Sequence, residues 1–140
     1  MNGQRNNGTP KAKILVVEDH APMAVLLTAL LTRAGCEVKV ASTGKAGMQL
    51  AQAGDFNLIT LNVDLPDISG FETFSRLKEN HRLSAIPMVF ISGRSSEANW
   101  QRGLELGAAD YIEKPFEGPA FVRRILSHVK FAQAENAHVC

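Results

Sequence analysis

The stretch Ile14-Leu15-Val16-Val17-Glu18-Asp19 joins a continuous run of branched apolar residues to two adjacent carboxylates. A short run of this kind is typical of a central strand that is buried on both faces. The same pattern, a largely apolar run followed by a polar side chain, recurs at Leu58–Leu61 before Asn62 and at Met88–Ile91 before Ser92, and Lys114 follows the short stretch Asp110–Glu113, which has Tyr and Ile at its centre. Because the carboxyl ends of parallel strands share one edge of a sheet, the spacing predicts that these polar side chains line a single site.

Helical patterns alternate with the apolar runs. The sequence predicts strands at residues 14–17, 36–41, 56–61, 88–91 and 110–112. It predicts helices at about residues 22–34, 71–80, 96–106 and 119–131, and one more that follows a cap at Ser42 or Thr43 and reaches about Ala53. Five β-α units in succession predict an α/β fold, with a five-stranded parallel sheet flanked by five helices.

Two of the predicted helices carry a clear apolar stripe that should face the sheet. The stripe of the first helix is predicted at Val25, Leu26, Ala29 and Leu30. The stripe of the third helix is predicted at Phe71, Phe74 and Leu77, with Glu72, Arg76 and Glu79 facing water.

Length and composition narrow the class of protein. The chain has 140 residues, which suits one domain that buries a core without metals or disulfides. Its 15 Lys and Arg residues nearly balance 14 Asp and Glu residues, so neither direct nucleic-acid binding nor attraction to a membrane surface is expected. No apolar run approaches the roughly 20 residues of a membrane helix. Cys36 and Cys140 lack metal-type spacing, and these features together predict a reduced cytoplasmic protein.

The predicted domain does not occupy the whole chain. Residues 1–11 are rich in Asn, Gly and Gln and are expected to form a flexible N-terminal segment, residues 12–131 the domain, and residues 132–140 a C-terminal tail. The tail is too short for a DNA-binding or catalytic domain. The chain is therefore either a single-domain regulator or a fragment of a longer protein.

The polar residues at the predicted edge suggest a chemistry. Glu18 and Asp19 repel each other unless a cation lies between them, and Mg²⁺ accepts two carboxylates together with another side-chain oxygen and a backbone carbonyl. The alternative is that both acids only favour the start of the following helix. Lys114 and Ser92 would add an ammonium and a hydroxyl for an anion, although each alone is more often a surface or capping residue. Together these groups suit phosphoryl transfer, but a nucleophile is missing.

These motifs closely resemble the receiver domain of two-component response regulators, the family that includes the bacterial chemotaxis regulator. The resemblance spans about Lys11 to Lys130. Besides the first strand and its acidic pair, it rests on Leu65-Pro66-Asp67-Ile68-Ser69-Gly70, on Ser92-Gly93 and on Lys114-Pro115-Phe116. It implies the flavodoxin-like (βα)5 receiver fold and a signalling domain that is not an enzyme. In that family an aspartate four residues before the loop proline accepts a phosphoryl group from a histidine kinase or phosphotransfer protein, and here that position is Asn62.

The resemblance also implies a role for each site residue. Asp19 would ligate Mg²⁺ directly, Glu18 through a water and Asp64 through its backbone carbonyl, with position 62 completing the metal site. Lys114 would contact the phosphoryl oxygens, and the Lys114–Pro115 peptide would be cis. Ser92 would follow the phosphoryl group, and Asp64 and Arg94 would flank it and could pair across the site.

In the family, phosphorylation changes an output surface on the fourth helix, fifth strand and fifth helix. Here Tyr111 is the aromatic residue that would rotate inward. Trp100 is either a packing residue or, if exposed beside Tyr111, a partner contact. The partner would be a downstream protein or effector domain, or a second copy of the chain in a homodimer through that surface.

Asn62 leaves several interpretations open. An amide has no anionic oxygen to attack phosphohistidine, so phosphorylation at this position should fail. Either Asn62 is a substitution that silences an ordinary receiver, which the intact acidic pair favours, or the chain is a natural phosphorylation-independent interaction module. Asp64 as a substitute acceptor is disfavoured because it lies beyond the strand. A flavodoxin-like cofactor binder is disfavoured because Glu18 and Asp19 would repel a phosphate.

Overall fold

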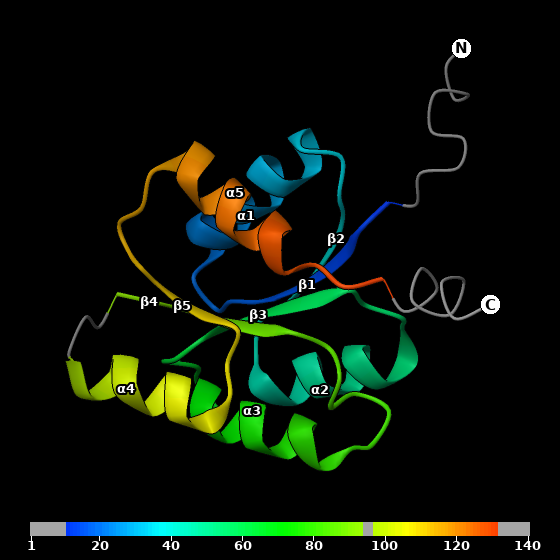
Figure 1. Ribbon diagram of the computed structural model, residues 1–140, viewed down its shortest axis with the longest axis vertical. Coiled ribbons are helices and arrows are strands. Elements are labelled where there is room, and N and C mark those ends of the chain that lie inside the picture. The colour runs from blue at the N-terminus through cyan, green and yellow to red at the C-terminus, as the bar shows by residue number, and fades with distance from the viewer. Residues whose placement is uncertain (1–10, 94–96, 132–140) are drawn as a thin grey trace.

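The computed structural model describes residues 11–93 and 97–131, which form one parallel sheet covered by helices on both faces (Figure 1). The strands are β1 (Lys13–Val17), β2 (Glu37–Ala41), β3 (Leu58–Asn62), β4 (Met88–Ser92) and β5 (Asp110–Glu113). Their order in the sheet is β2-β1-β3-β4-β5, and every neighbouring pair is parallel. The predicted (βα)5 flavodoxin-like fold is confirmed. Residues 1–10 of the expected N-terminal segment (1–11), the expected tail 132–140 with Cys140, and the predicted pairing of Arg94 lie outside the described residues.

The helices divide between the two faces of the sheet (Figure 1). They are α1 (Ala21–Arg33), α2 (Gly44–Ala53), α3 (Gly70–Glu79), α4 (Glu97–Leu106) and α5 (Gly118–His128). In β1, Leu15 and Val17 face the core under α2, α3 and α4, whereas Ile14 and Val16 face the core under α1 and α5. All four side chains are at most 1% exposed, as predicted for a central strand.

The predicted stripe of α1 is wrong except for Leu30, which is partly buried against the core. The buried residues of this helix are Ala24, Leu27 and Leu31, while Val25 is 68% exposed and Leu26 is 43% exposed. Apolar residues occur on more than one side of α1, so the sequence offers two stripes at helical spacing. Packing against β1 selects one of them and leaves the other at the surface.

Prediction was accurate for α2 and α3. Thr43 caps α2, since its hydroxyl accepts a hydrogen bond from the Ala46 backbone N–H at 3.0 Å. In α3 the predicted stripe of Phe71, Phe74 and Leu77 is buried. Its Glu72 and Arg76 form an exposed ion pair at 3.0 Å, four residues apart along the helix.

A second cap on α2 comes from the loop that follows β3. Both carboxylate oxygens of Asp67 accept hydrogen bonds, from the Gly44 backbone N–H at 2.8 Å and from the Lys45 backbone N–H at 2.9 Å. Burial raises the pKa of Asp67, but backbone hydrogen bonds, including those from Gly44 and Lys45, together outweigh it and lower the pKa to about 2. A carboxylate at a helix N-terminus is favourable because it satisfies N–H groups that have no partner within the helix.

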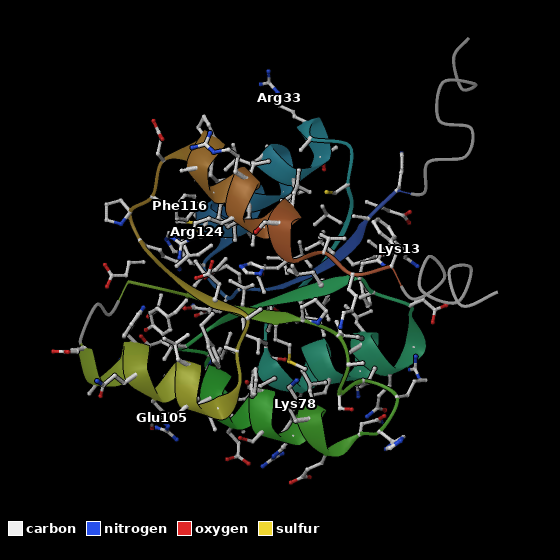
Figure 2. The ribbon with its side chains drawn as sticks, viewed as in Figure 1. Lys13, Arg33, Lys78, Glu105, Phe116 and Arg124 are labelled. Carbon is white, nitrogen blue, oxygen red and sulfur yellow. The ribbon has the colours of Figure 1, made fainter. Side chains whose placement is uncertain are left out.

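Helix α5 ends three residues earlier than predicted, at His128. The chain continues as a non-helical segment that Asn57 holds. The Asn57 side chain accepts a hydrogen bond from the Lys13 backbone N–H at 2.7 Å and donates one to the Lys130 carbonyl at 3.1 Å. Lys13 lies at the end of the sheet where both ends of the described chain meet (Figures 1 and 2). Within the described residues, no helix is long and apolar enough to cross a membrane.

Candidate functional site

The sequence-predicted polar residues converge at the carboxyl ends of the strands, here called the acidic edge (Glu18, Asp19, Asn62, Asp64 and Lys114). Strands β1 and β3 are neighbours in the sheet although β2 lies between them in sequence, so the edge sits where the strand order reverses. This is the position at which open α/β sheets form their binding crevice.

Asn62 is the last residue of β3 and only 8% exposed. Its side-chain nitrogen Nδ2 donates to Glu18 Oε2 at 3.1 Å, to Asp19 Oδ1 at 2.9 Å and to the Asp64 backbone carbonyl at 3.2 Å. The amide therefore joins both members of the acidic pair to the loop after β3.

Glu18 is the buried member of the acidic pair. Its side chain is 1% exposed, and its Oε1 lies 3.0 Å from Lys114 Nζ, whose side chain is 17% exposed. The His20 backbone N–H also donates to Glu18 Oε2 at 3.1 Å. Buried charges require partners of this kind because removal from water is otherwise costly. The Lys114–Pro115 peptide that positions this lysine is cis, as expected.

The chain passes very close to Asn62 at Gly70, where α3 begins. The Gly70 backbone N–H donates to the Val63 carbonyl at 2.8 Å. A Cβ at position 70 would lie 2.2 Å from the Asn62 backbone oxygen, which no contact allows. Because glycine has no Cβ, the start of α3 can lie against the backbone at the end of β3. Gly70 is part of the motif quoted above, but the sequence did not indicate which atoms it approaches.

Ser92 ends β4 and is completely buried. Its carbonyl accepts a hydrogen bond from the Lys114 backbone N–H at 2.8 Å, so the two predicted phosphoryl-contacting residues are adjacent. The Lys114 side chain itself is directed to Glu18.

Tyr111 is 2% exposed, and its ring packs at 6.0 Å from that of Phe90. Trp100 is 43% exposed, and both residues line a cavity of about 490 Å³ between α4, β5 and α5. The structure thus shows the arrangement, an exposed Trp100 beside Tyr111, that the sequence analysis associated with a partner contact. Phe116 and Arg124 line the same cavity (Figure 2).

The sequence analysis did not identify Gly103 of α4. A Cβ at this position would lie 3.0 Å from ring atoms of both Phe90 and Tyr111. Gly103 therefore lets α4 pack closely over the inward ring of Tyr111. A signal was present, because an isolated glycine inside a helix costs stability and usually has a packing reason.

Asp110 at the start of β5 interacts with α5. It pairs with Arg124 at 3.0 and 2.6 Å and with the His128 ring at 3.1 Å. Partial burial raises the pKa of the Asp110 carboxyl, but the hydrogen bonds from Arg124, from the Tyr111 backbone N–H and from His128 outweigh it and hold that pKa below its ordinary value.

Replacing Arg124 with glutamine is expected to lower the free energy of unfolding by up to about 1 kcal/mol near neutral pH, since Arg124 is half exposed. The depressed pKa of Asp110 stabilises the fold above the unfolded-state value of about 3.9, and this contribution is lost as the pH falls through the folded-state pKa. In urea unfolding, the difference in stability between the two proteins should narrow as the pH falls from about 7 to about 3. A difference that grew on acidification would contradict this assignment.

Comparison with known proteins identifies the family. The response regulator receiver domain pattern matches residues 14–126, and the chain belongs to this family of two-component signalling domains. Histidine kinase P4 of Formosa agariphila is 40% identical over 115 residues, which are 82% of this chain and 8% of that protein. Transcriptional regulatory protein CusR of Escherichia coli K12 is 35% identical over 113 residues, which are 81% of this chain and 49% of that protein. The chain thus spans about half the length of CusR and less than a tenth of the kinase.

Comparison with solved structures supports the same family assignment. Chemotaxis protein CheY4 of Vibrio cholerae superposes with a TM-score of 0.81 at 25% identity, over 86% of this chain and 100% of that one. Receiver domains are typically signalling domains without an enzymatic activity, bind Mg²⁺ in their active site, and interact with histidine kinases and effector domains. The family resemblance found in the sequence is confirmed.

Proposed function

We propose that this chain is a receiver domain that presents its interaction surface without accepting a phosphoryl group at position 62. The observation that carries the proposal is the Asn62 amide, whose nitrogen faces both carboxylates of the acidic edge. Attack on a phosphoryl group needs an oxygen nucleophile with an available electron pair, and an uncharged amide offers a poor one. Phosphoryl transfer from a histidine kinase or phosphotransfer protein would therefore stop at this residue.

The other residues of the acidic edge support the proposal. Lys114 Nζ is engaged by Glu18 at 3.0 Å, so its charge already has a partner. An anion at the edge would have to draw Lys114 away from a carboxylate that is 1% exposed, and leaving that charge buried without its partner costs several kcal/mol.

Tyr111 supports a function of this domain that does not depend on phosphorylation. By the family resemblance, inward rotation of this aromatic residue accompanies phosphorylation, yet here the ring is only 2% exposed although position 62 is an asparagine. The inward ring leaves the cavity beside Trp100 accessible to a downstream protein, an effector domain or a second copy of the chain. Trp100 and Tyr111 would anchor such a partner.

Acetyl phosphate, a small donor that needs no kinase, tests the proposal. With Mg²⁺ present, the unaltered chain is expected to gain no phosphoryl group by intact mass, while Asn62→Asp gains one that hydroxylamine removes. Asn62→Asp/Lys114→Ala serves as a matched control, because it restores the carboxylate but removes the ammonium that stabilises developing charge.

Each result has a clear meaning. Phosphorylation of the unaltered chain, mapped to Asp64 or another residue, would overturn the proposal. If Asn62→Asp is not phosphorylated either, the edge is not a silenced switch, and the interaction-module function alone stands.

A further inference from the structure

We propose that the Asn62 side-chain amide takes the place of a divalent cation at the acidic edge, so that the carboxylates of this receiver keep hydrogen-bond donors without metal. The inference deepens the proposed function and rests on it, because it concerns the regulation of the same site. It follows from the three oxygens that converge on one nitrogen atom.

The geometry assigns the nitrogen, not the oxygen, of the amide to this position. Nδ2 lies 3.1 Å from Glu18 Oε2, 2.9 Å from Asp19 Oδ1 and 3.2 Å from the Asp64 carbonyl oxygen. Its two hydrogens are shared among three acceptors. Turning the amide over would bring Oδ1 against the same three oxygens with no hydrogen between them, which is repulsive.

These acceptors are also the oxygens that the family resemblance would assign to Mg²⁺. Mg²⁺ requires near-octahedral oxygen ligands at about 2.1 Å and gives up its waters reluctantly. To bind here it would have to displace the amide from all three oxygens and compete with Lys114 for Glu18. The side chains in this arrangement do not fit the ion.

The charge balance leads to the same result. Glu18, Asp19 and Lys114 together carry one net negative charge. A divalent cation would reverse it to one positive charge, whereas with aspartate at position 62 the same cation would bring the group to neutrality. Asparagine therefore removes one ligand and one negative charge, and both changes weaken the attraction of the site for the metal.

Calorimetric titration of MgCl₂ without any phosphoryl donor tests the inference on the unaltered chain, Asn62→Asp and Asn62→Ala. Asn62→Asp is expected to bind at least about tenfold more tightly than the unaltered chain. Asn62→Ala offers no side-chain oxygen, yet it should also bind more tightly than the unaltered chain because the competing amide is gone. NaCl at matched ionic strength separates binding from screening.

The alanine variant gives the sharpest result. If the unaltered chain binds Mg²⁺ more tightly than Asn62→Ala, the amide acts as a ligand through Oδ1 and the inference is overturned. Should the alanine variant fail to fold, the Asn62 side-chain NH₂ signals in a ¹⁵N correlation spectrum provide the second test. In the unaltered chain, the Asn62 NH₂ signals are expected to persist at Mn²⁺ concentrations that, in Asn62→Asp, already broaden the signals of residues near Asp19. Selective loss of these signals at low Mn²⁺ would equally overturn the inference.

The two proposals fail in different ways. Tight Mg²⁺ binding by the unaltered chain, without phosphorylation, would remove the cation-substitute inference and leave the proposed function intact. Phosphorylation of the unaltered chain by acetyl phosphate would remove the proposed function itself.

Discussion

Gly70→Ala is expected to lower the free energy of unfolding by about 3 kcal/mol or more. The added methyl group would lie 2.2 Å from the Asn62 backbone oxygen and 2.9 Å from both the Asn62 carbonyl carbon and Val63 Cα. These are backbone atoms, so no side-chain rotation relieves the contact. Either the start of α3 moves away from β3 or the end of β3 shifts, and both changes disturb the acidic edge.

Urea unfolding measures the effect, and Gly93→Ala is the matched control. Gly93 follows β4 and is exposed, and a Cβ there would meet nothing within 4 Å. The control should change the free energy of unfolding by no more than about 0.5 kcal/mol. Equal effects of the two substitutions would show that the approach of Gly70 to Asn62 is not a constraint on the fold.

Lys114→Met is expected to lower the free energy of unfolding by about 3 kcal/mol. The substitution preserves much of the side-chain length and packing but removes the ammonium 3.0 Å from Glu18 Oε1. The carboxylate left behind is 1% exposed, and the donors that remain to it among the described residues, Asn62 and the His20 backbone, bind its other oxygen. A buried charge without its counter-charge is among the larger single causes of destabilisation.

The double variant Glu18→Gln/Lys114→Met isolates the cause. Removing both charges leaves no buried ion, so the double variant should be more stable than Lys114→Met alone. The four proteins of this cycle, compared by urea unfolding, give the coupling between the two residues. A double variant less stable than Lys114→Met would contradict this assignment, because it would mean that the Glu18 carboxylate is stabilised by its other hydrogen-bond donors even without the lysine.

The parts of the fold that were predictable are those set by local periodicity. The apolar run at β1 fits only a buried strand, and α3 has only one apolar stripe, formed by Phe71, Phe74 and Leu77. Helix α1 did not, because two apolar stripes coexist on it, and only contact with the sheet decides between them. The end of α5 was also unpredictable, since the contact that stops it comes from Asn57, more than 70 residues earlier in the chain.

At the acidic edge, too, the sequence predicts one part of the arrangement and not the other. The rule that parallel strands end at one edge is sufficient to place Glu18, Asn62 and Lys114 together. The rule could not indicate that Lys114 pairs with Glu18, or which atom of the Asn62 amide faces the carboxylates. Those choices depend on distances of about 3 Å between residues far apart in sequence.

Asn57 binds the chain where it enters the sheet at Lys13 and where it leaves at Lys130. The two ends of the described domain are therefore neighbours, and a short linker between them would close the backbone into a ring without spanning the molecule. The geometry is that of a domain suited to circular permutation or to insertion within another protein. A neighbour joined at either end would begin at the amino end of β1, away from the acidic edge at the opposite end of the strands.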